Sequence, residues 1–254
     1  MRLTVLGSSA SYAGAGQATA GYLVEVGDVR VLLDCGHGAL ANLAMVTDPL
    51  GLEAVFVSHG HIDHFADIYA LQALLRFAPE GPAAPCTLYV PCGLFGRMGA
   101  VLTDHAREEL VQAFDVHELA AKESVLLGGL SVTPYPVDHM DPTFALVVEA
   151  DGTRLCYTSD TAPGEAVLEA ARGCDLLLAE CTLPQKYSGM AAHMTAAQAA
   201  GLARDAGAKR LVLTHLWPTS GRDTLLREAA AIFDGPISVA REFETHQIGG
   251  SGRQ

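Results

Sequence analysis

The sequence predicts a mixed α/β fold in which helices cover the outer faces of two β-sheets. Short apolar runs bounded by turn residues predict strands at residues 3–6, 21–26, 29–33, 55–57, 88–90, 130–135, 144–149, 154–158, 176–179 and 211–214. Apolar residues at helical spacing predict helices at residues 66–77, 165–172, 196–206 and 223–233. Because strands and helices alternate along most of the chain, sheets under outer helices are the simplest architecture.

The predicted elements are joined by turns and loops, with no sign of a linker between domains. Gly27-Asp28, between the second and third strands, is typical of a tight hairpin, so the first sheet starts with antiparallel strands. Residues 79–85 are rich in Pro, Gly and Ala, but strand-like sequence resumes directly after them, which favours a loop. We therefore expect one domain over residues 1–248, with residues 249–254 as a disordered tail.

Composition sets limits on the class of protein and its partners. Half of the 254 residues are hydrophobic and 18% are charged, which is enough to build a large core. No run approaches the ~18 apolar residues of a membrane helix, and the N-terminal apolar stretch is too short for a signal peptide, so we expect a soluble cytoplasmic protein without a membrane partner. The net charge of −13 produces a field that repels nucleic acid.

The six cysteines carry no CxxC pair, which argues against both a disulfide framework and a thiolate metal site. We interpret them as small buried hydrophobic residues.

The segment Ser58-His59-Gly60-His61-Ile62-Asp63-His64 places four potential metal ligands within six residues, directly after a buried strand. In an extended chain, residues two apart point the same way, so His59 and His61 can bind one metal ion. A turn into the next helix can then direct Asp63 and His64 toward a second ion. The alternative, four solvated loop residues, is disfavoured because few structural needs produce such a cluster.

Three further candidate ligands stand where a predicted strand meets a loop: His139, Asp160 and His215. Each would be weak evidence alone, since a single histidine after a strand is usually an ordinary core or surface residue. Together they occur in the order needed to complete two metal sites.

This order, HxHxDH followed by a separate His, an Asp and a final His, resembles the dinuclear metallo-β-lactamase superfamily over nearly the whole chain. The resemblance implies a four-layer αββα sandwich and two divalent metal ions, with zinc expected and manganese or iron as alternatives. It also implies one metal site formed by His59, His61 and His139, a second formed by Asp63, His64 and His215, and Asp160 as the bridge between them. Asp34 matches the carboxylate that holds the ligand loop.

Two further segments narrow the branch of this superfamily. The residues around Glu180 and the run His193-Met194-Thr195 resemble the paired "HEAT" and "HST" motifs of RNase Z-like phosphodiesterases, although Ala179 replaces the first histidine of HEAT. The resemblance implies that His193 lies beside the scissile phosphate and that Glu180 orients it, which suits an acid that protonates an alkoxide leaving group. We count Asp63, His193 and Glu180 as the catalytic residues. The alternative is that His193 merely precedes a helix and Glu180 ends a strand near solvent.

The substrate class follows from a segment that the chain lacks. RNase Z enzymes usually insert a tRNA-gripping arm between the third metal motif and the bridging Asp, whereas here Asp160 follows His139 by 21 positions and two strands fill the interval. We therefore expect a phosphodiesterase that acts on small phosphodiesters such as 3′,5′-cyclic nucleotides, with nucleic acid disfavoured. The alternatives are a tRNA 3′-end endoribonuclease, a lactone or thioester hydrolase, and a non-catalytic binding module. A homodimer would be common in the family.

Four histidines, His37, His105, His117 and His246, remain outside these motifs. His37 lies near the expected metal site, but a role in loop packing is favoured over substrate contact because glycines flank it. The other three are predicted to be ordinary surface or partly buried residues. Residues 7–11 could offer backbone N–H groups to a phosphate, although a plain turn is the simpler prediction.

Overall fold

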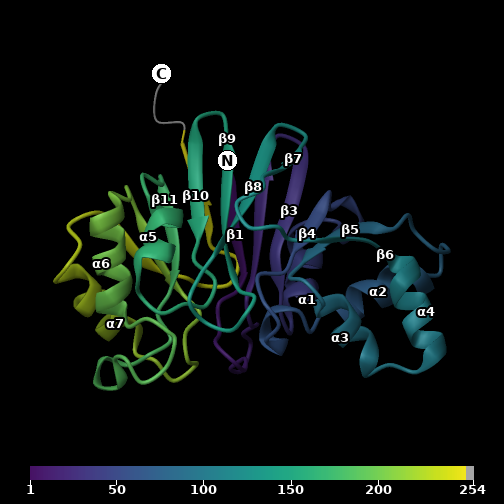
Figure 1. Ribbon diagram of the computed structural model, residues 1–254, viewed down its shortest axis with the longest axis horizontal. Coiled ribbons are helices and arrows are strands. Elements are labelled where there is room, and N and C mark those ends of the chain that lie inside the picture. Colours follow the sequence, from purple (N-terminus) through teal and green to yellow (C-terminus); the bar gives the residue numbers. More distant parts are fainter. Residues whose placement is uncertain (250–254) are drawn as a thin grey trace.

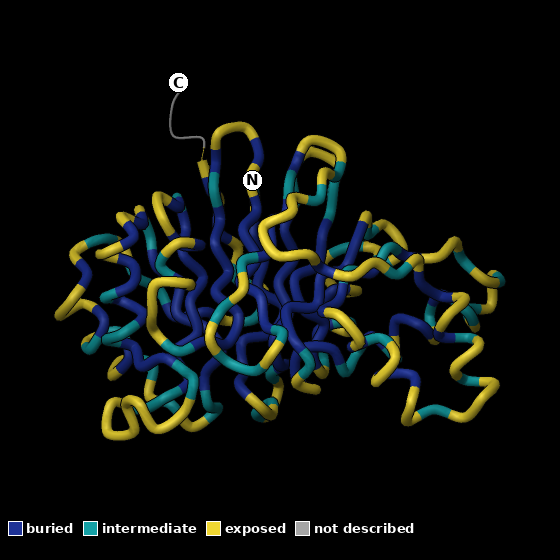
Figure 2. Tube along the Cα trace, viewed as in Figure 1, coloured by how far each residue is buried: buried dark blue, intermediate teal, exposed yellow. Residues whose placement is uncertain are grey.

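A computed structural model describes residues 1–249 and contains two seven-stranded sheets packed face to face, with helices on both outer faces (Figure 1). This four-layer αββα arrangement confirms the predicted fold class. The central strands are buried along most of their length, and exposed residues gather in the turns and on the outer helices (Figure 2). Within residues 1–249, no helix has both the length and the apolar character needed to cross a membrane.

The first sheet has the order β14-β1-β2-β3-β4-β5-β6. Its strands are β1 (Arg2–Gly7), β2 (Gly21–Val26), β3 (Val29–Cys35), β4 (Ala54–Phe56), β5 (Cys86–Val90), β6 (Phe114–Glu118) and β14 (Thr245–Gln247). The strands from β14 to β3 pair antiparallel and those from β3 to β6 pair parallel. Gly27 and Asp28 form the predicted hairpin turn between β2 and β3.

The second sheet repeats this division, with the order β13-β12-β11-β10-β9-β8-β7. Its strands are β7 (Val125–Leu127), β8 (Leu130–Pro136), β9 (Phe144–Ala150), β10 (Thr153–Tyr157), β11 (Leu176–Glu180), β12 (Leu211–Thr214) and β13 (Ile237–Val239). Here β7 to β10 pair antiparallel and β10 to β13 pair parallel.

Helices cover the outer face of each sheet. Against the first sheet lie α1 (Ala39–Val46), α2 (Ile68–Phe77), α3 (Leu94–Ala100) and α4 (Asp104–Ala113), and against the second lie α5 (Glu165–Ala171), α6 (Ala196–Ala206) and α7 (Arg222–Ala230). Short 3-10 turns occur at η1 (Pro49–Gly51), η2 (Ile62–His64) and η3 (Gln185–Tyr187).

The alternation of side chains along the strands builds three apolar layers. On β3, Val31 and Leu33 face the core between the two sheets, whereas Leu32 between them faces the helices of the first sheet. Tyr22 and Tyr157, one from each sheet, meet in the central core with ring centroids 4.8 Å apart. The two sheets are therefore held in a fixed relation by a continuous apolar interior.

This topology also determines where polar side chains can gather. The parallel strands β3 and β4 of one sheet and β10, β11 and β12 of the other end at the lower edge of the sandwich (Figure 1). Loops that follow parallel strands share one edge of a sheet, and ligand sites form in the crevice beside it. All the candidate ligands follow strands of these two sets or β8, which is separated from β10 by β9 and runs in the same direction as β10.

Several elements differ from the prediction. The helices α1, α3 and α4 and the strands β6, β7, β13 and β14 were absent from it, because they are short, interrupted by glycine or largely polar on their exposed side. Cys92 is exposed, which corrects the expectation that all six cysteines are buried; it lies in the turn between β5 and α3, where the chain reaches the surface. Residues 250–254 of the expected tail lie outside the described residues.

Candidate metal centre

Seven candidate ligands from distant parts of the chain converge at the lower edge of the sandwich. His59 and His61 come from the loop after β4, and Asp63 and His64 lie in η2. The others follow separate strands of the second sheet: His139 after β8, Asp160 after β10 and His215 after β12. The convergence agrees with the predicted set, and no described residue of that set lies elsewhere.

One group consists of His59, His61, His139 and Asp160, each of which offers a ligand atom within 4.8 Å of the others. His61 Nδ1 is 3.2 Å from His139 Nε2. Asp160 Oδ2 lies 3.6 Å from His59 Nε2 and 3.7 Å from His139 Nε2. These atoms surround a volume suited to one cation.

A second group consists of Asp63, His64 and His215. His215 Nε2 is 3.2 Å both from His64 Nε2 and from Asp63 Oδ2. Asp160 Oδ2, already part of the first group, is also 3.5 Å from His64 Nε2. One carboxylate oxygen therefore lies against both groups, as a bridging ligand would.

These spacings fit metal ions better than hydrogen bonds. Ligands held tetrahedrally about 2.0–2.1 Å from a zinc ion lie about 3.3–3.4 Å apart, close to the distances between these nitrogens. His59 Nε2 is buried without a hydrogen-bond partner, although it points into the first group. A buried polar atom without a partner is costly, and a cation would satisfy it.

The other ring nitrogen of four candidate histidines is held by an oxygen. His59 Nδ1 is 3.1 Å from Ser58 Oγ, His64 Nδ1 donates to Asp34 Oδ2 at 2.7 Å, and His139 Nδ1 donates to the Ala192 carbonyl at 2.9 Å. The fourth ring has the same type of partner: His215 Nδ1 is 2.8 Å from Thr182 Oγ1. Such partners fix ring orientation and are usual for metal-binding histidines.

Charge in the site also suits metal binding. Burial lowers the pKa of His59, His61 and His139, so these rings are neutral and free to ligate near pH 7. Burial would likewise lower the pKa of His64, but the carboxylates of Asp160 and Asp34 outweigh it and raise that pKa well above its usual value. These carboxylates therefore stabilise a positive charge at the second group.

Asp34 holds the ligand loop through four donors. Its Oδ1 accepts from the Ser58 N–H at 2.7 Å, and its Oδ2 accepts from Ser58 Oγ, His64 Nδ1 and Tyr157 Oη at 2.7–2.9 Å. Asp34 is fully buried and adopts a positive φ of 56° at the end of β3, which aims the carboxylate along the loop. The sequence prediction for Asp34 agrees with this arrangement, but Tyr157 gave no sequence signal because it reads as a core residue.

Glu180 and His193 form a pair beside the candidate ligands. Glu180 is fully buried at the end of β11 and accepts from His193 Nδ1 at 2.8 Å, which excludes the alternative of a glutamate near solvent. Its carboxylate also accepts from the backbone N–H groups of Thr161 and Thr182. The His193 ring lies 4.8 Å from the His139 ring, centroid to centroid.

Two local features fix His193 in this position. Thr195 caps α6 with a capping box completed by Gln198, so the helix starts at Ala196, three residues after His193. Met194 is fully buried, and its carbonyl accepts from the Leu183 N–H at 3.0 Å. Burial of the ring would lower the pKa of His193, but the hydrogen bond and charge of Glu180 outweigh it and raise that pKa.

One contact of the site had no sequence signal. The backbone N–H of Ser11 donates to Asp63 Oδ2 at 2.7 Å, from a loop in which Ser11 has a φ of 59°. The segment 7–11 was predicted as a plain turn, with a phosphate ligand as the alternative. Its N–H group instead positions a carboxylate, which depends on a loop conformation that composition does not specify.

The four remaining histidines lie outside the cluster. His105 and His117 are exposed and His246 is buried in β14. His37 serves loop packing through its carbonyl, which accepts from the Thr19 N–H at 3.0 Å, while its side chain stays 78% exposed. The predicted packing role is thus carried by the main chain, while the exposed imidazole has Nδ1 3.9 Å from Asp67 Oδ1.

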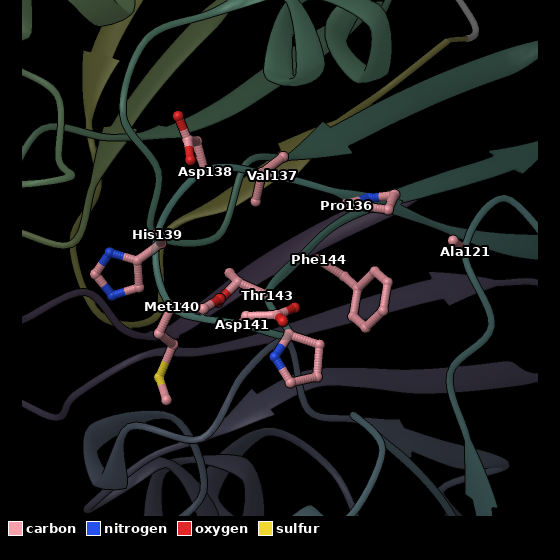
Figure 3. A pocket seen from close by; sticks show the side chains of 10 residues that line it. Ala121, Pro136, Val137, Asp138, His139, Met140, Asp141, Thr143 and Phe144 are labelled. Carbon is pink, nitrogen blue, oxygen red and sulfur yellow. The ribbon is translucent and has the colours of Figure 1, made fainter.

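Two cavities adjoin the candidate metal centre. The His139 cavity, about 480 Å³, is lined by residues 136–144 and Ala121, with His139 and Phe144 toward opposite ends of the lining (Figure 3). The Asp63 cavity, about 540 Å³, is lined by parts of the loop 11–19, by His37 and Gly38, and by Ile62, Asp63 and Ala66. Both volumes lie within the range of small-molecule sites.

Comparison with known proteins gives a consistent picture. A family model described as "Beta-lactamase superfamily domain" matches residues 29–216. The uncharacterized protein Rv1339 of Mycobacterium tuberculosis is 33% identical over 255 aligned residues, covering 98% of this chain and 92% of that protein. The probable metallo-hydrolase YhfI of Bacillus subtilis is 29% identical over 244 residues, covering 95% of this chain and 97% of that protein.

Two further comparisons concern structure and branch. The crystal structure of the metallo-beta-lactamase fold protein YhfI from Bacillus subtilis superimposes with a TM-score of 0.87 at 26% identity, over 98% of this chain and 99% of that one. Ribonuclease Z of Myxococcus xanthus is 28% identical over 297 residues, covering 94% of this chain and 95% of that protein. Together with the His/Asp cluster, these matches show that the chain is a metal-dependent hydrolase of the metallo-β-lactamase fold and belongs to the beta-lactamase superfamily.

Proposed function

We propose that this hydrolase is a dinuclear-metal phosphodiesterase that acts on small phosphodiesters such as 3′,5′-cyclic nucleotides. The observation that carries the proposal is the Glu180–His193 pair beside the metal cluster. A lone metal cluster would serve many hydrolytic reactions, since one fold supports many chemistries. A buried carboxylate–imidazole pair next to it adds a proton donor, which an alkoxide leaving group requires.

In this proposal His59, His61 and His139 hold one ion, Asp63, His64 and His215 hold the other, and Asp160 bridges them. Two divalent ions held there would activate water and stabilise the charge that develops on the phosphoryl oxygens. Their charge exceeds that of the two aspartates, so the site attracts an anionic substrate even though the chain as a whole carries −13.

His193 donates the proton to the leaving oxygen. Its Nδ1 is engaged by Glu180, which leaves Nε2 as the nitrogen that can face the substrate. The raised pKa keeps the ring protonated over more of the neutral range, and the ring lies 6.1 Å from that of His215, centroid to centroid. Glu180 keeps its orientation through the two N–H donors of Thr161 and Thr182.

The preference for a small substrate rests on the short segment between His139 and Asp160. The strands β9 (Phe144–Ala150) and β10 (Thr153–Tyr157) occupy it, joined by the turn Asp151-Gly152, so this interval contains no protruding arm. The alignment with ribonuclease Z spans 297 positions, more than the 254 residues of this chain, whereas the alignment with Rv1339 spans 255. Ribonuclease Z therefore has many positions without a counterpart here.

A second candidate function is cleavage of precursor tRNA at its 3′ end, favoured by the 28% identity to a protein named Ribonuclease Z. The charge balance opposes it, because binding several RNA phosphates draws its affinity from clustered lysine and arginine, and the chain has 16 of these against 29 acidic residues. Hydrolysis of a lactone or thioester is the third possibility, and the same experiment tests it.

The test is a comparison of rates in one preparation at physiological salt. The substrates are cyclic AMP, bis(p-nitrophenyl) phosphate, an acyl lactone and a precursor tRNA. We expect turnover of both small phosphodiesters and little cleavage of the tRNA or the lactone. Correctly placed tRNA cleavage without turnover of cyclic AMP would contradict the proposal, and a lactone rate above both phosphodiester rates would do the same.

A further inference from the structure

The Asp63 cavity opens beside the candidate metal centre and shares Asp63 with it. A group attached to a phosphate at the metals can therefore extend into the cavity. Its mixed lining of apolar, amide, imidazole and carboxylate groups determines which kind of group it can hold.

The apolar part of the lining is unusually exposed. Tyr12 is 51% exposed and Ile62 is 66% exposed, and they line the cavity from two separate segments of the chain. The ring of Tyr12 is supported by Trp217, with a centroid separation of 5.7 Å, so it does not depend on a ligand for its position. An exposed aromatic ring and an exposed aliphatic side chain suit a flat group that can lie against them.

The polar part of the lining includes the Gln17 amide, the His37 imidazole and the Asp63 carboxylate. Gln17 accepts from Ser9 Oγ at 3.4 Å through Oε1, which leaves its amide N–H groups and a lone pair free. The His37 imidazole is exposed, with Nδ1 3.9 Å from Asp67 Oδ1. Neither lysine nor arginine lines the cavity. It therefore lacks the groups that would hold a second phosphate, and it offers the donor-and-acceptor amide that pairs with the edge of an adenine.

The His139 cavity is less suitable for the same group. Asp138 and Asp141 contribute carboxylates to its lining, together with Val137, Pro142 and Phe144 (Figure 3). Two carboxylates close to an anionic substrate weaken its binding, whereas Asp63, the carboxylate that lines the Asp63 cavity, belongs to the candidate metal centre. The lining of the His139 cavity also has no side-chain amide.

We propose that the Asp63 cavity binds the nucleobase of the substrate, with the base lying against Tyr12 and Ile62 and its edge hydrogen-bonded to the amide of Gln17. This inference rests on the proposed function and assigns the substrate-recognition site to the loop 11–19. Gly14 supports the assignment, because a Cβ atom at this position would collide with Gln17 Oε1. Because Gly14 has no side chain, the Gln17 amide can occupy its present position.

The test uses two substrates that differ only in the base: cyclic AMP, and methyl riboside 3′,5′-cyclic phosphate, in which a methoxy group replaces adenine. The variants are Gln17→Leu, which removes the amide, and Gly14→Ala, which keeps the amide but displaces it. We expect both to raise KM for cyclic AMP about tenfold, the size of one lost hydrogen bond, with kcat little changed. Rates on the base-free analogue should equal those of the wild type.

Tyr187→Ala is the matched control, since Tyr187 is an exposed tyrosine that does not line this cavity. It should leave both substrates unaffected. Unchanged KM for cyclic AMP in Gln17→Leu and Gly14→Ala would overturn the base site, as would an equal loss on the analogue.

A second measurement separates this inference from the proposed function. Adenosine, added while the wild type hydrolyses bis(p-nitrophenyl) phosphate, should inhibit competitively, and Gln17→Leu should weaken that inhibition about tenfold. A wild type that hydrolyses this ester but not cyclic AMP would contradict the proposed function. In that case, inhibition by adenosine would still test whether the Asp63 cavity binds a nucleobase. No inhibition by adenosine would overturn the base site.

Discussion

The two halves of the molecule contribute to the candidate metal centre in different ways. The first sheet supplies four candidate ligands from one loop of six residues, His59 to His64. The second supplies His139, Asp160 and His215 from three separate strand ends. The first half thus carries a local motif, while the second carries single residues that follow β8, β10 and β12 and that the order of the second sheet brings together.

Each half also holds residues of the other in place. Tyr157 of the second sheet donates to Asp34 of the first, and Tyr22 of the first sheet is hydrogen-bonded to Thr214 of the second at 2.8 Å. Ser159, next to Asp160, donates to Ser58 Oγ at 2.8 Å. The halves therefore cannot form the site separately, even though their contributions differ in sequence pattern.

The largest effect should follow from replacing Asp160, the residue that touches both groups. Asp160→Ala should lose both ions and at least about 10⁴-fold in kcat/KM, because each ion stabilises the transition state by several kcal/mol. His61→Ala, which removes a ligand of one group, should have the smaller effect. Metal analysis and rates on bis(p-nitrophenyl) phosphate check this. Near-normal metal content in Asp160→Ala would show that Asp160 is not the bridge.

A smaller effect is expected from His193, which contributes chemistry rather than metal binding. His193→Ala should keep its metal content and lose about 10²–10⁴-fold on a cyclic nucleotide, whose alkoxide leaving group needs a proton. The loss on bis(p-nitrophenyl) phosphate should be much smaller, because p-nitrophenolate leaves without protonation. Equal losses on the two substrates would refute the role of proton donor.

The smallest effects should come from the two tyrosines that link the sheets. Tyr157→Phe removes a buried hydrogen bond to a carboxylate and should cost about 1.5–3 kcal/mol of unfolding free energy. Tyr22→Phe removes a bond between neutral hydroxyls and should cost about 0.5–1.5 kcal/mol. Urea denaturation of both variants measures the difference. A larger loss for Tyr22→Phe would contradict the picture in which Asp34 is the more important contact across the sheets.

The fold class and the convergence of the candidate ligands could be predicted because both depend on patterns that are visible in the amino-acid sequence. Strand alternation and the HxHxDH spacing are local, and the order of the later ligands matched a known family. The contacts of Ser11, Tyr157 and Thr182 were not predictable. These contacts depend on loop conformation and on packing between the sheets. In the sequence alone, the three residues look like ordinary turn or core residues.

Edge elements escaped prediction for a related reason. The strand β14 (Thr245–Gln247) pairs with β1 through three residues, and only His246 of the three is buried. A strand of this length has too few alternating positions to show a pattern. Its place is determined by the open edge of β1, which is a property of the folded sheet.

Metal stoichiometry tests most directly whether the two halves build one dinuclear centre. Elemental analysis of the purified chain after saturation with zinc and removal of the excess should find two ions per chain. A chelator should remove them together with activity on bis(p-nitrophenyl) phosphate, and zinc should restore both. One ion per chain at full activity, or full activity without metal, would contradict the dinuclear centre.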